Sequence, residues 1–204
     1  MVQVVKQPTQ DQRIVQPERT WEQFKLIQQG FDNSPGVRLF YYNGTLEILV
    51  PGRDHERFSA VIALLLGIFL IEKGIEFEPT GSMDQEKPGE AFVQADQSYC
   101  FDSSNSLPDL SIEVVLTSGG INKLARYRAL GIPEVWFWED GVFSLYHLRE
   151  DGYEQIDRSE LPALVDLDLN LLTQCVLMAQ TSRLEAAKLF RQGIQLGPDK
   201  IISI

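Results

Sequence analysis

Two acidic residues have the surroundings and the spacing of a catalytic pair. Asp96 is the only charged residue in the segment 92–100, and Glu113 lies 17 positions later in the segment LPDLSIEVVL, residues 107–116. Both segments are strand-like, and the separation is enough for two adjacent strands and a loop. Two carboxylates on neighbouring strands can hold Mg²⁺, a hard cation that takes few protein ligands. Such an ion can activate water and stabilise the charge that develops on a phosphodiester.

The strand pattern around Glu113 allows two interpretations. One face of the strand is apolar, and the other face carries Glu113 with Asp109, Ser111 and Val115. In the first interpretation the strand is half-exposed and Glu113 faces solvent. In the second, the helix and strands that follow cover both faces of the sheet. Glu113 would then be a buried carboxylate, which needs a partner or a metal ion.

Basic residues follow at the start of the next expected helix. Lys123 and Arg126 open this helix, and Arg128 lies slightly further on. If the helix points back over the sheet, Lys123 can neutralise a phosphate or help to position an attacking water. The alternative is a surface lysine on an amphipathic helix, and spacing alone does not decide between them.

The elements that must position these residues alternate between strands and helices. Thr20 and Gln23 form a capping box, Asn43-Gly44 marks a hairpin, and Asp54 is the expected cap of a long helix. The expected helices cover 21–29, 55–73, 120–130 and 169–192, and the expected strands cover 37–42, 45–50, 75–79, 91–100, 109–116, 134–139, 142–148 and 153–157. This order predicts an α/β (α+β) fold with a mixed sheet flanked by helices, preceded by an N-terminal helix and hairpin. The expected organisation is a flexible Gln-rich arm over 1–17, a domain over 18–168, and a C-terminal helix and tail over 169–204.

Composition limits the classes of function. The chain has 204 residues, with 18 basic and 29 acidic side chains and a net charge of −11. An acidic protein does not coat nucleic acid, although it can act on it through a small local site. The apolar run 61–71 is too short to span a membrane, and no signal peptide is evident. Cys100 and Cys175 lie in apolar surroundings and are expected to be free thiols, which fits a cytoplasmic location.

A resemblance to a known family rests on the run PDLSIEVVLTS…KLARYRALGIPEVWFWED. The positions that carry it are Pro108, Asp109, Glu113, Val114, Ser118, Lys123, Tyr127, Gly131, Ile132 and Trp136, and upstream the hairpin with Glu47 and the Asp54-His55-Glu56 helix start. Over about residues 18–160 the chain resembles the Uma family of restriction endonucleases, which is widespread in bacteria.

The resemblance implies the PD-(D/E)xK nuclease fold and a metal-dependent hydrolytic site. By position, Asp96 corresponds to the first carboxylate and Glu113 to the second, and these two would bind Mg²⁺ or Mn²⁺. Val115 occupies the place of the usual lysine, and the resemblance suggests that Lys123 on the next helix replaces it. Glu56 matches a helix carboxylate that often completes such sites.

Several residues have alternative interpretations. The family usually has proline before the first aspartate, whereas this chain has Ala95. Asp109 is the other candidate for that aspartate, but four residues along one strand place it about 13 Å from Glu113. His55 is either a ligand or base or, more commonly, a surface histidine at a helix N-terminus. Glu47 is a weaker site candidate, because a hairpin glutamate is usually solvated. His147 is assigned no role.

The leading hypothesis is a Mg²⁺- or Mn²⁺-dependent endonuclease acting on DNA. In it Asp96 and Glu113 bind the metal, Lys123 stabilises the attacking hydroxide or the developing charge, and Glu56 orients a metal-bound water. The alternative is a catalytically inactive protein of the same fold that serves as a binding or assembly module. A small-molecule binder is a third and weaker hypothesis. The apolar hairpins and terminal helix also predict a homodimer.

Overall fold

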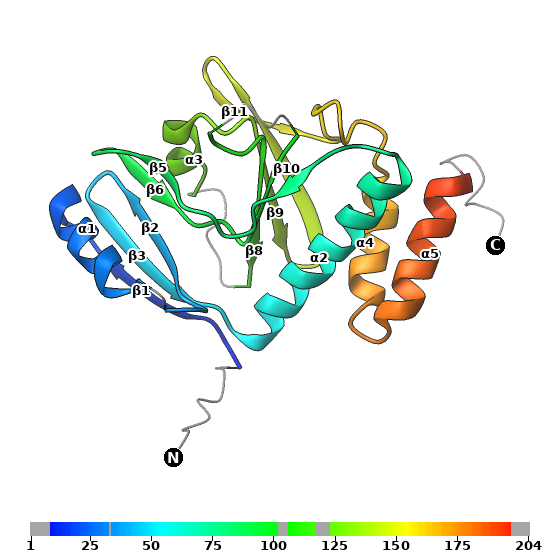
Figure 1. Cartoon of the computed structure of the whole chain (residues 1–204), viewed down its shortest axis with the longest axis horizontal. Coiled ribbons are helices and arrows are strands. Elements are labelled where there is room, and N and C mark those ends of the chain that lie inside the picture. Colours follow the sequence, from blue (N-terminus) through cyan, green and yellow to red (C-terminus); the bar gives the residue numbers. More distant parts are fainter. Residues whose placement is uncertain (1–8, 33, 102–105, 117–122, 197–204) are drawn as a thin grey trace.

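The computed structural model describes residues 9–32, 34–101, 106–116 and 123–196 (Figure 1). Over these residues the helices are α1 (Trp21–Gly30), α2 (Arg53–Glu72), α3 (Leu124–Leu130), α4 (Leu169–Met178) and α5 (Arg183–Leu196). The strands are β1 (Gln12–Gln16), β2 (Arg38–Tyr42), β3 (Thr45–Val50), β4 (Glu78–Pro79), β5 (Gln85–Lys87), β6 (Ala91–Val93), β7 (Gln97–Cys100), β8 (Leu110–Val115), β9 (Glu134–Glu139), β10 (Val142–Arg149) and β11 (Gly152–Ile156). The predicted α/β class is confirmed.

The strands form two sheets. The first sheet has the order β1-β3-β2-β6-β5 and is antiparallel throughout. The second sheet has the order β11-β10-β9-β8-β7-β4 and is mixed, because β8 and β9 run parallel while the other neighbours are antiparallel. Helix α3 supplies the crossover between β8 and β9, as a parallel pair requires.

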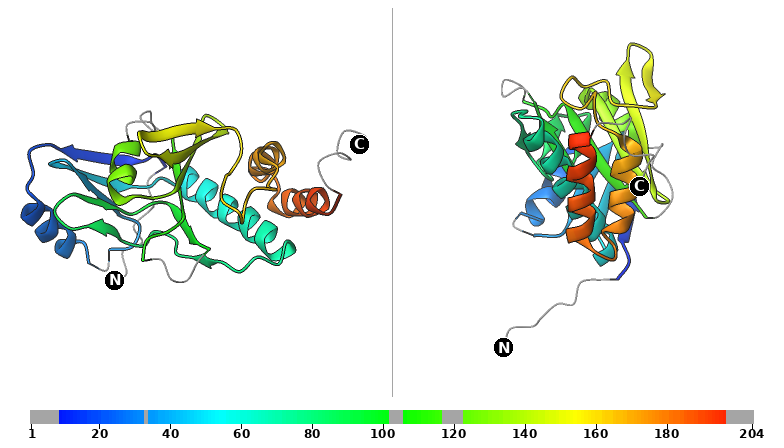
Figure 2. Two further views of the ribbon diagram at one scale, coloured as in Figure 1. Left: turned by 90° about the horizontal axis from the view of Figure 1, so that it is seen from above. Right: turned by 90° about the vertical axis from the view of Figure 1, so that its right-hand side faces the viewer.

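Three apolar clusters separate the layers. α1 covers one face of the first sheet, where Phe24 packs on Tyr41 and Phe92. The other face of that sheet meets α3 and the second sheet around Phe40, Val115 and Tyr127. On the far side of the second sheet, α2, α4 and α5 bury the largest cluster. Figures 1 and 2 show α1 and β1 at one end of the molecule and α4 and α5 at the other, with α2 between them.

Among the described elements, the chain passes between the two sheets three times. Helix α2 links β3 to β4, residues 80–84 link β4 to β5, and residues 94–96 link β6 to β7. Two of these connections are therefore only three to five residues long, and they hold the sheets close together.

The structure corrects several expectations about individual elements. The expected strand over 91–100 is two strands, β6 and β7, that belong to different sheets. Residues 12–16 were expected in a flexible arm but form β1, which pairs with β3. The terminal helix expected over 169–192 is interrupted near Thr181 and forms α4 and α5, and strand β5 was not expected.

Helix starts gave one confirmed and one wrong prediction. The capping box of Thr20 and Gln23 is present at α1. The N-cap of helix α2 is Gly52 rather than Asp54, which lies in the first turn. A Cβ atom at position 52 would lie 2.7 Å from the carbonyl carbon of Gln10, so only glycine allows the segment before β1 to pass this closely.

Cys100 and Cys175 are buried free thiols, as expected. None of the helices in the described part of the chain has both the length and the apolar character needed to span a membrane.

Candidate active site

Glu113 lies at the centre of the seam between the two sheets. Its side chain is 1% exposed, and it points from β8 toward α3. Oε2 is 2.8 Å from Lys123 Nζ, and Oε1 is 3.2 Å from Arg126 Nη2 and accepts a hydrogen bond from the Tyr127 hydroxyl. The solvent-facing interpretation of Glu113 is therefore wrong, because α3 folds back over this face of the sheet.

The neighbouring cations keep this carboxylate ionised. Burial alone would raise the pKa of Glu113, but Lys123 and Arg126 lower it to about 2. Burial and the adjacent Glu113 carboxylate raise the pKa of Tyr127 well above its ordinary value, so the hydroxyl remains a donor. Val115, which follows on the same face, is apolar and buried, and Lys123 at the start of α3 supplies the cation in its place.

Arg126 joins Glu113 to the first sheet. Its Nη1 is 3.2 Å from Oε2 of Glu47 on β3, and its guanidinium lies 3.9 Å from the centre of the Phe40 ring. Arg13 on β1 contacts the same Glu47 carboxylate at 2.8 Å. The prediction that Glu47 is solvated is wrong, because its carboxylate is enclosed between Arg13 and Arg126 with 7% of the residue exposed.

Asp96 lies in the short connection where the chain leaves the first sheet for the second. Its Oδ2 accepts a 2.8 Å hydrogen bond from the backbone N–H of Val114, the residue after Glu113. Strands β7 and β8 pair antiparallel, with Gln97 opposite Ile112. Continuing this register by one residue places Asp96 opposite Glu113. The two acidic residues are thus neighbours across adjacent strands, and both are buried.

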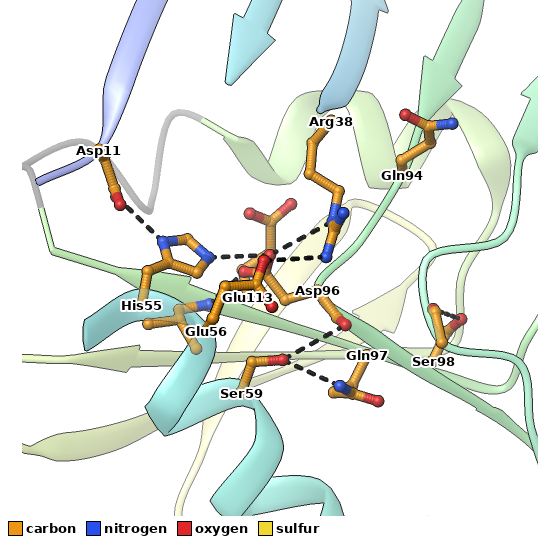
Figure 3. Close-up of polar contacts among 12 residues, drawn as sticks. Asp11, Arg38, His55, Glu56, Ser59, Gln94, Asp96, Gln97, Ser98 and Glu113 are labelled. Carbon is orange, nitrogen blue, oxygen red and sulfur yellow. Dashed lines mark hydrogen bonds and ion pairs between the residues drawn. The ribbon is translucent and has the colours of Figure 1, made fainter. Parts of the chain in front are cut away.

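His55 lies between two carboxylates at the start of α2 (Figure 3). Its Nδ1 is 3.0 Å from Oδ2 of Asp11, and its Nε2 is 2.8 Å from Oδ1 of Asp96. Burial would lower the pKa of His55, but the hydrogen bonds and charges of the two aspartates raise it to about 10, so the ring is a cation at neutral pH. The expectation of a surface histidine is wrong, since the residue is 1% exposed.

Asp11 was not predicted from the sequence, because its role depends on the close approach of the segment before β1 to Gly52, which no local pattern reveals. Its Oδ1 accepts a 2.7 Å hydrogen bond from the Gly52 backbone N–H, directly before α2. The protonated His55 lowers the pKa of Asp11 against the effect of burial. The one available signal was Gly52 itself, because a glycine before a helix start permits such an approach.

Glu56 is connected to the site through Arg38. Oε1 of Glu56 is 3.4 Å from Arg38 Nη2, and Arg38 Nε is 3.8 Å from Oδ1 of Asp96 (Figure 3). The Glu56 side chain is 38% exposed, unlike Asp96 and Glu113. The structure therefore places Glu56 at the rim of the site, with Arg38 between it and Asp96.

Asp109 belongs to the turn that enters β8. Its Oδ2 accepts a 2.8 Å hydrogen bond from the Phe101 N–H, and its backbone bonds to Tyr99 and Glu134. His147 contacts the buried Glu134 at 3.3 Å in another part of the second sheet. These contacts connect the ends of strands and do not involve Asp96 or Glu113.

Comparison with known proteins identifies the family. The family model of Uma2, described as "Putative restriction endonuclease", matches residues 21–178. The chain belongs to the Uma2 family. The resemblance inferred from the sequence is thereby confirmed, and this family assignment supports a nuclease.

One solved structure is similar to this chain over part of its length. This Uma2 chain is similar to a crystal structure described as a putative nuclease belonging to DUF820 from Anabaena variabilis, with a TM-score of 0.49 and 13% sequence identity. The match covers 68% of this chain and 90% of the other. No curated protein matches the chain.

The carboxylates of the candidate site in this Uma2 protein are of the type that binds a divalent metal ion. Within the described ranges, no group of three or more His, Cys, Asp or Glu side chains is arranged to hold a metal. Mg²⁺ does not need such a group, because it commonly uses one or two carboxylates and keeps several waters. Asp96 and Glu113 supply hard oxygen ligands of this kind on adjacent strands, so the donor chemistry fits.

Charges in the cluster are balanced without a metal. Five carboxylates interact with five cationic side chains: Asp11, Glu47, Glu56, Asp96 and Glu113 with Arg13, Arg38, His55, Lys123 and Arg126. The crevice between Asp11, Glu47, His55 and Lys123 has a volume of only about 10 Å³, about the minimum for one water. Lys123 and Arg126 already contact the two oxygens of Glu113, so a metal ion bound by this carboxylate would take the place of one of these cations.

Proposed function

We propose that this Uma2 protein is a Mg²⁺- or Mn²⁺-dependent endonuclease that hydrolyses phosphodiester bonds in DNA. The observation that carries the proposal is the convergence of three side chains. The Val114 N–H donates a 2.8 Å hydrogen bond to Asp96 Oδ2, which holds Asp96 beside Glu113, and Lys123 Nζ lies 2.8 Å from Glu113 Oε2. Two carboxylates on adjacent strands, with a lysine beside one of them, are the set that the family resemblance implies.

Asp96 and Glu113 would hold the ion. When bound, a divalent ion lowers the pKa of a coordinated water and neutralises charge on the phosphate. His55 fixes the Asp96 carboxylate from one side and the Val114 N–H fixes it from the other, so Asp96 is oriented before any ligand binds. This preorganisation reduces the reorganisation needed during the reaction.

Lys123 is the residue we assign to the reacting phosphate. Its side chain is 11% exposed, whereas the Arg126 side chain is 7% exposed and is also held by Glu47. Lys123 can therefore leave Glu113 for an incoming phosphate at a smaller energetic cost than Arg126. In that position its ammonium group would stabilise the attacking hydroxide or the charge that develops on the phosphate. Glu56, at the rim, would orient a water from the exposed side.

The test combines metal binding with cleavage. Calorimetric titration of Mn²⁺ is expected to show binding to the wild-type protein and loss of binding in Glu113→Gln and Asp96→Asn. Nicking of supercoiled plasmid in Mg²⁺ or Mn²⁺ should fall by at least about 1,000-fold in both variants, because the ion supplies several kcal/mol of transition-state stabilisation. Wild-type protein that is folded and cleaves neither DNA nor RNA with either metal would favour the inactive binding module.

Glu134→Gln is the matched control. Glu134 lies on the adjacent strand β9, is 0% exposed, and belongs to a different set of contacts. The control variant should bind Mn²⁺ and cleave plasmid within about threefold of wild type. Circular dichroism confirms that each variant is folded. The homodimer predicted from the sequence is tested on the same samples by light scattering.

A further inference from the structure

An open cavity lies on the first-sheet side of the candidate active site. It has a volume of about 630 Å³, within the range of about 300–1,000 Å³ that small-molecule sites occupy. Its walls come from the end of α1, the segment before β2, the 80–84 connection and the 94–96 connection. The lining residues that carry the argument are Gln28, Phe31, Arg38, Ser82, Asp84 and Gln94.

The polar side chains of this cavity are oriented by one another. Gln94 Oε1 accepts a 2.7 Å hydrogen bond from the Leu39 backbone N–H, and Gln94 Nε2 donates to Asp84 Oδ1 at 2.7 Å. Gln28 Nε2 donates to Asp84 Oδ2 at 3.0 Å. These contacts fix both amide groups and leave each with further hydrogen-bonding capacity.

The charged residues that line the cavity favour a ligand whose buried part is uncharged. Asp32 and Asp84 oppose the single cation Arg38, so a phosphate is repelled from most of the cavity. Phe31 adds an aromatic ring that is only partly buried. Amides that pair with a planar polar edge, together with an aromatic ring, form the combination that proteins use to bind exposed nucleobases.

Two residues connect the cavity to the carboxylates. Arg38 lines the cavity, and its guanidinium reaches Asp96 at 3.8 Å and Glu56 at 3.4 Å. Its Nε is buried and makes no hydrogen bond within the part of the chain that the structure describes. Gln94 is two residues before Asp96, and Figure 3 shows Gln94 on the far side of Arg38 from His55. A ligand in the cavity would therefore lie one side chain away from the candidate metal ligands.

We propose that this cavity binds one nucleobase of the DNA, next to the phosphodiester that is cleaved. Gln28 and Gln94 contact the polar edge of the base, Phe31 contacts its face, and Arg38 binds the phosphate between the base and the metal ligands. The inference rests on the proposed function and adds a specificity-determining site to it. It predicts that cleavage depends on the identity of one base beside the cut.

The first test uses mononucleotides without metal. Deoxynucleoside 5′-monophosphates are titrated into ¹⁵N-labelled protein in EDTA, and the side-chain amide signals of Gln28 and Gln94 are followed. We expect these signals to shift with one base preferred, and to shift much less with deoxyribose 5-phosphate, which has no base. Equal shifts with deoxyribose 5-phosphate, or none with any nucleotide, would overturn the proposal.

Matched variants locate the binding. Ser82→Trp fills the cavity and is expected to weaken nucleotide binding at least tenfold. Val165→Trp fills a different cavity of about 510 Å³ between α2, α4 and α5 and should leave binding unchanged. Gln28→Ala, on the surface of α1, should weaken nucleotide binding about three- to tenfold through one lost hydrogen bond. This variant tests the cavity if Ser82→Trp does not fold.

Plasmid cleavage separates this inference from the proposed function. If wild type cleaves and Ser82→Trp or Gln28→Ala cleaves with unchanged rate and base preference, the cavity proposal is wrong and the nuclease proposal stands. If wild type does not cleave but base-dependent shifts are present and are lost in Ser82→Trp, the nuclease proposal fails and the base site stands. Reduced cleavage by Ser82→Trp and Gln28→Ala, with unchanged Mn²⁺ binding, supports both the nuclease proposal and the cavity proposal.

Discussion

Two buried glutamates on adjacent parallel strands show how differently this protein treats the same side chain. Glu113 on β8 and Glu134 on β9 are 1% and 0% exposed, and they point to opposite faces of the second sheet. Glu134 accepts hydrogen bonds from Trp136 Nε1, Ser159 Oγ and the Glu160 N–H. Glu113 is held by Lys123, Arg126 and the Tyr127 hydroxyl.

The difference lies in whether the partners can be exchanged. The donors around Glu134 are mainly neutral groups built into the chain, which tie β9 to the 159–160 turn. Two partners of Glu113 are cationic side chains, and a metal ion can take the place of Lys123, the more exposed of the two, without leaving the carboxylate unpaired. Buried charge that is balanced by exchangeable cations is therefore a better indicator of a ligand site than burial alone.

Stability measurements should separate the two glutamates most clearly. Glu113→Gln is expected to lower the free energy of unfolding by about 3 kcal/mol, because buried cations lose their counter-charge. Glu134→Gln should cost about 1 kcal/mol, because most of its donors keep an acceptor. Urea unfolding measures both. Adding Lys123→Met to Glu113→Gln should recover part of the loss, and a further loss would contradict the charge argument.

His55 provides a contrast with Lys123, because it is a buried cation that remains beside Asp96 in our proposal. His55→Gln removes the charge beside Asp96 but keeps a hydrogen-bond donor. Side chains that orient a metal ligand typically contribute 10- to 100-fold to affinity, so Mn²⁺ binding should weaken by about that factor. Calorimetric titration measures the change. His147→Gln, which alters the contact of Glu134, is the control and should leave the affinity unchanged.

The pH dependence of stability should reveal the same histidine. The folded pKa of His55, about 10, lies above its ordinary value of 6.5. Its stabilising contribution is therefore complete below pH 6.5 and is lost as the pH rises toward 10. Between pH 7 and pH 10 the metal-free protein should lose at least about 1.4 kcal/mol, the equivalent of one pKa unit. Urea unfolding of His55→Gln should show a smaller loss, and equal losses would refute the assignment.

Asp109 provides the smallest expected effect. Its contact with the Phe101 N–H holds the entry to β8, on the same strand as Glu113 but four residues away. Asp109→Asn should leave Mn²⁺ affinity and plasmid nicking within about threefold of wild type. A loss comparable with that of Asp96→Asn would make Asp109 the first carboxylate of the site instead.

Local patterns predicted most of the elements but not their division between sheets. The Asn43-Gly44 hairpin, the α1 capping box and the long helix follow from short-range chemistry, and all are present. The 91–100 segment contains no glycine or proline that would mark a break, so nothing local indicated that Gln94-Ala95-Asp96 crosses between sheets. β1 was missed because its pairing with β3 depends on partners that are 30 to 38 residues away in the sequence.

The candidate site could be predicted where residues follow one another closely along the chain. Glu113, Lys123 and Arg126 lie within one strand–helix unit, and their contacts follow from that unit. Asp11, Glu47 and Arg38 enter from the first sheet, and their contributions depend on how the two sheets pack. The burial of His55 and Glu47 could not be inferred for the same reason.

The three connections between the sheets carry much of the candidate chemistry: His55 and Glu56 at the start of α2, Ser82 and Asp84 in the second connection, and Gln94 and Asp96 in the third. A displacement of one sheet against the other must be absorbed by these connections, two of which are very short. Asp96 stays beside Glu113 in such a displacement, because the β7–β8 register and the Val114 N–H hold it within the second sheet, whereas Arg38 on the first sheet moves relative to Asp96. A ligand that contacts both sheets would therefore change the distance between the Arg38 guanidinium and the Asp96 carboxylate without contacting either group.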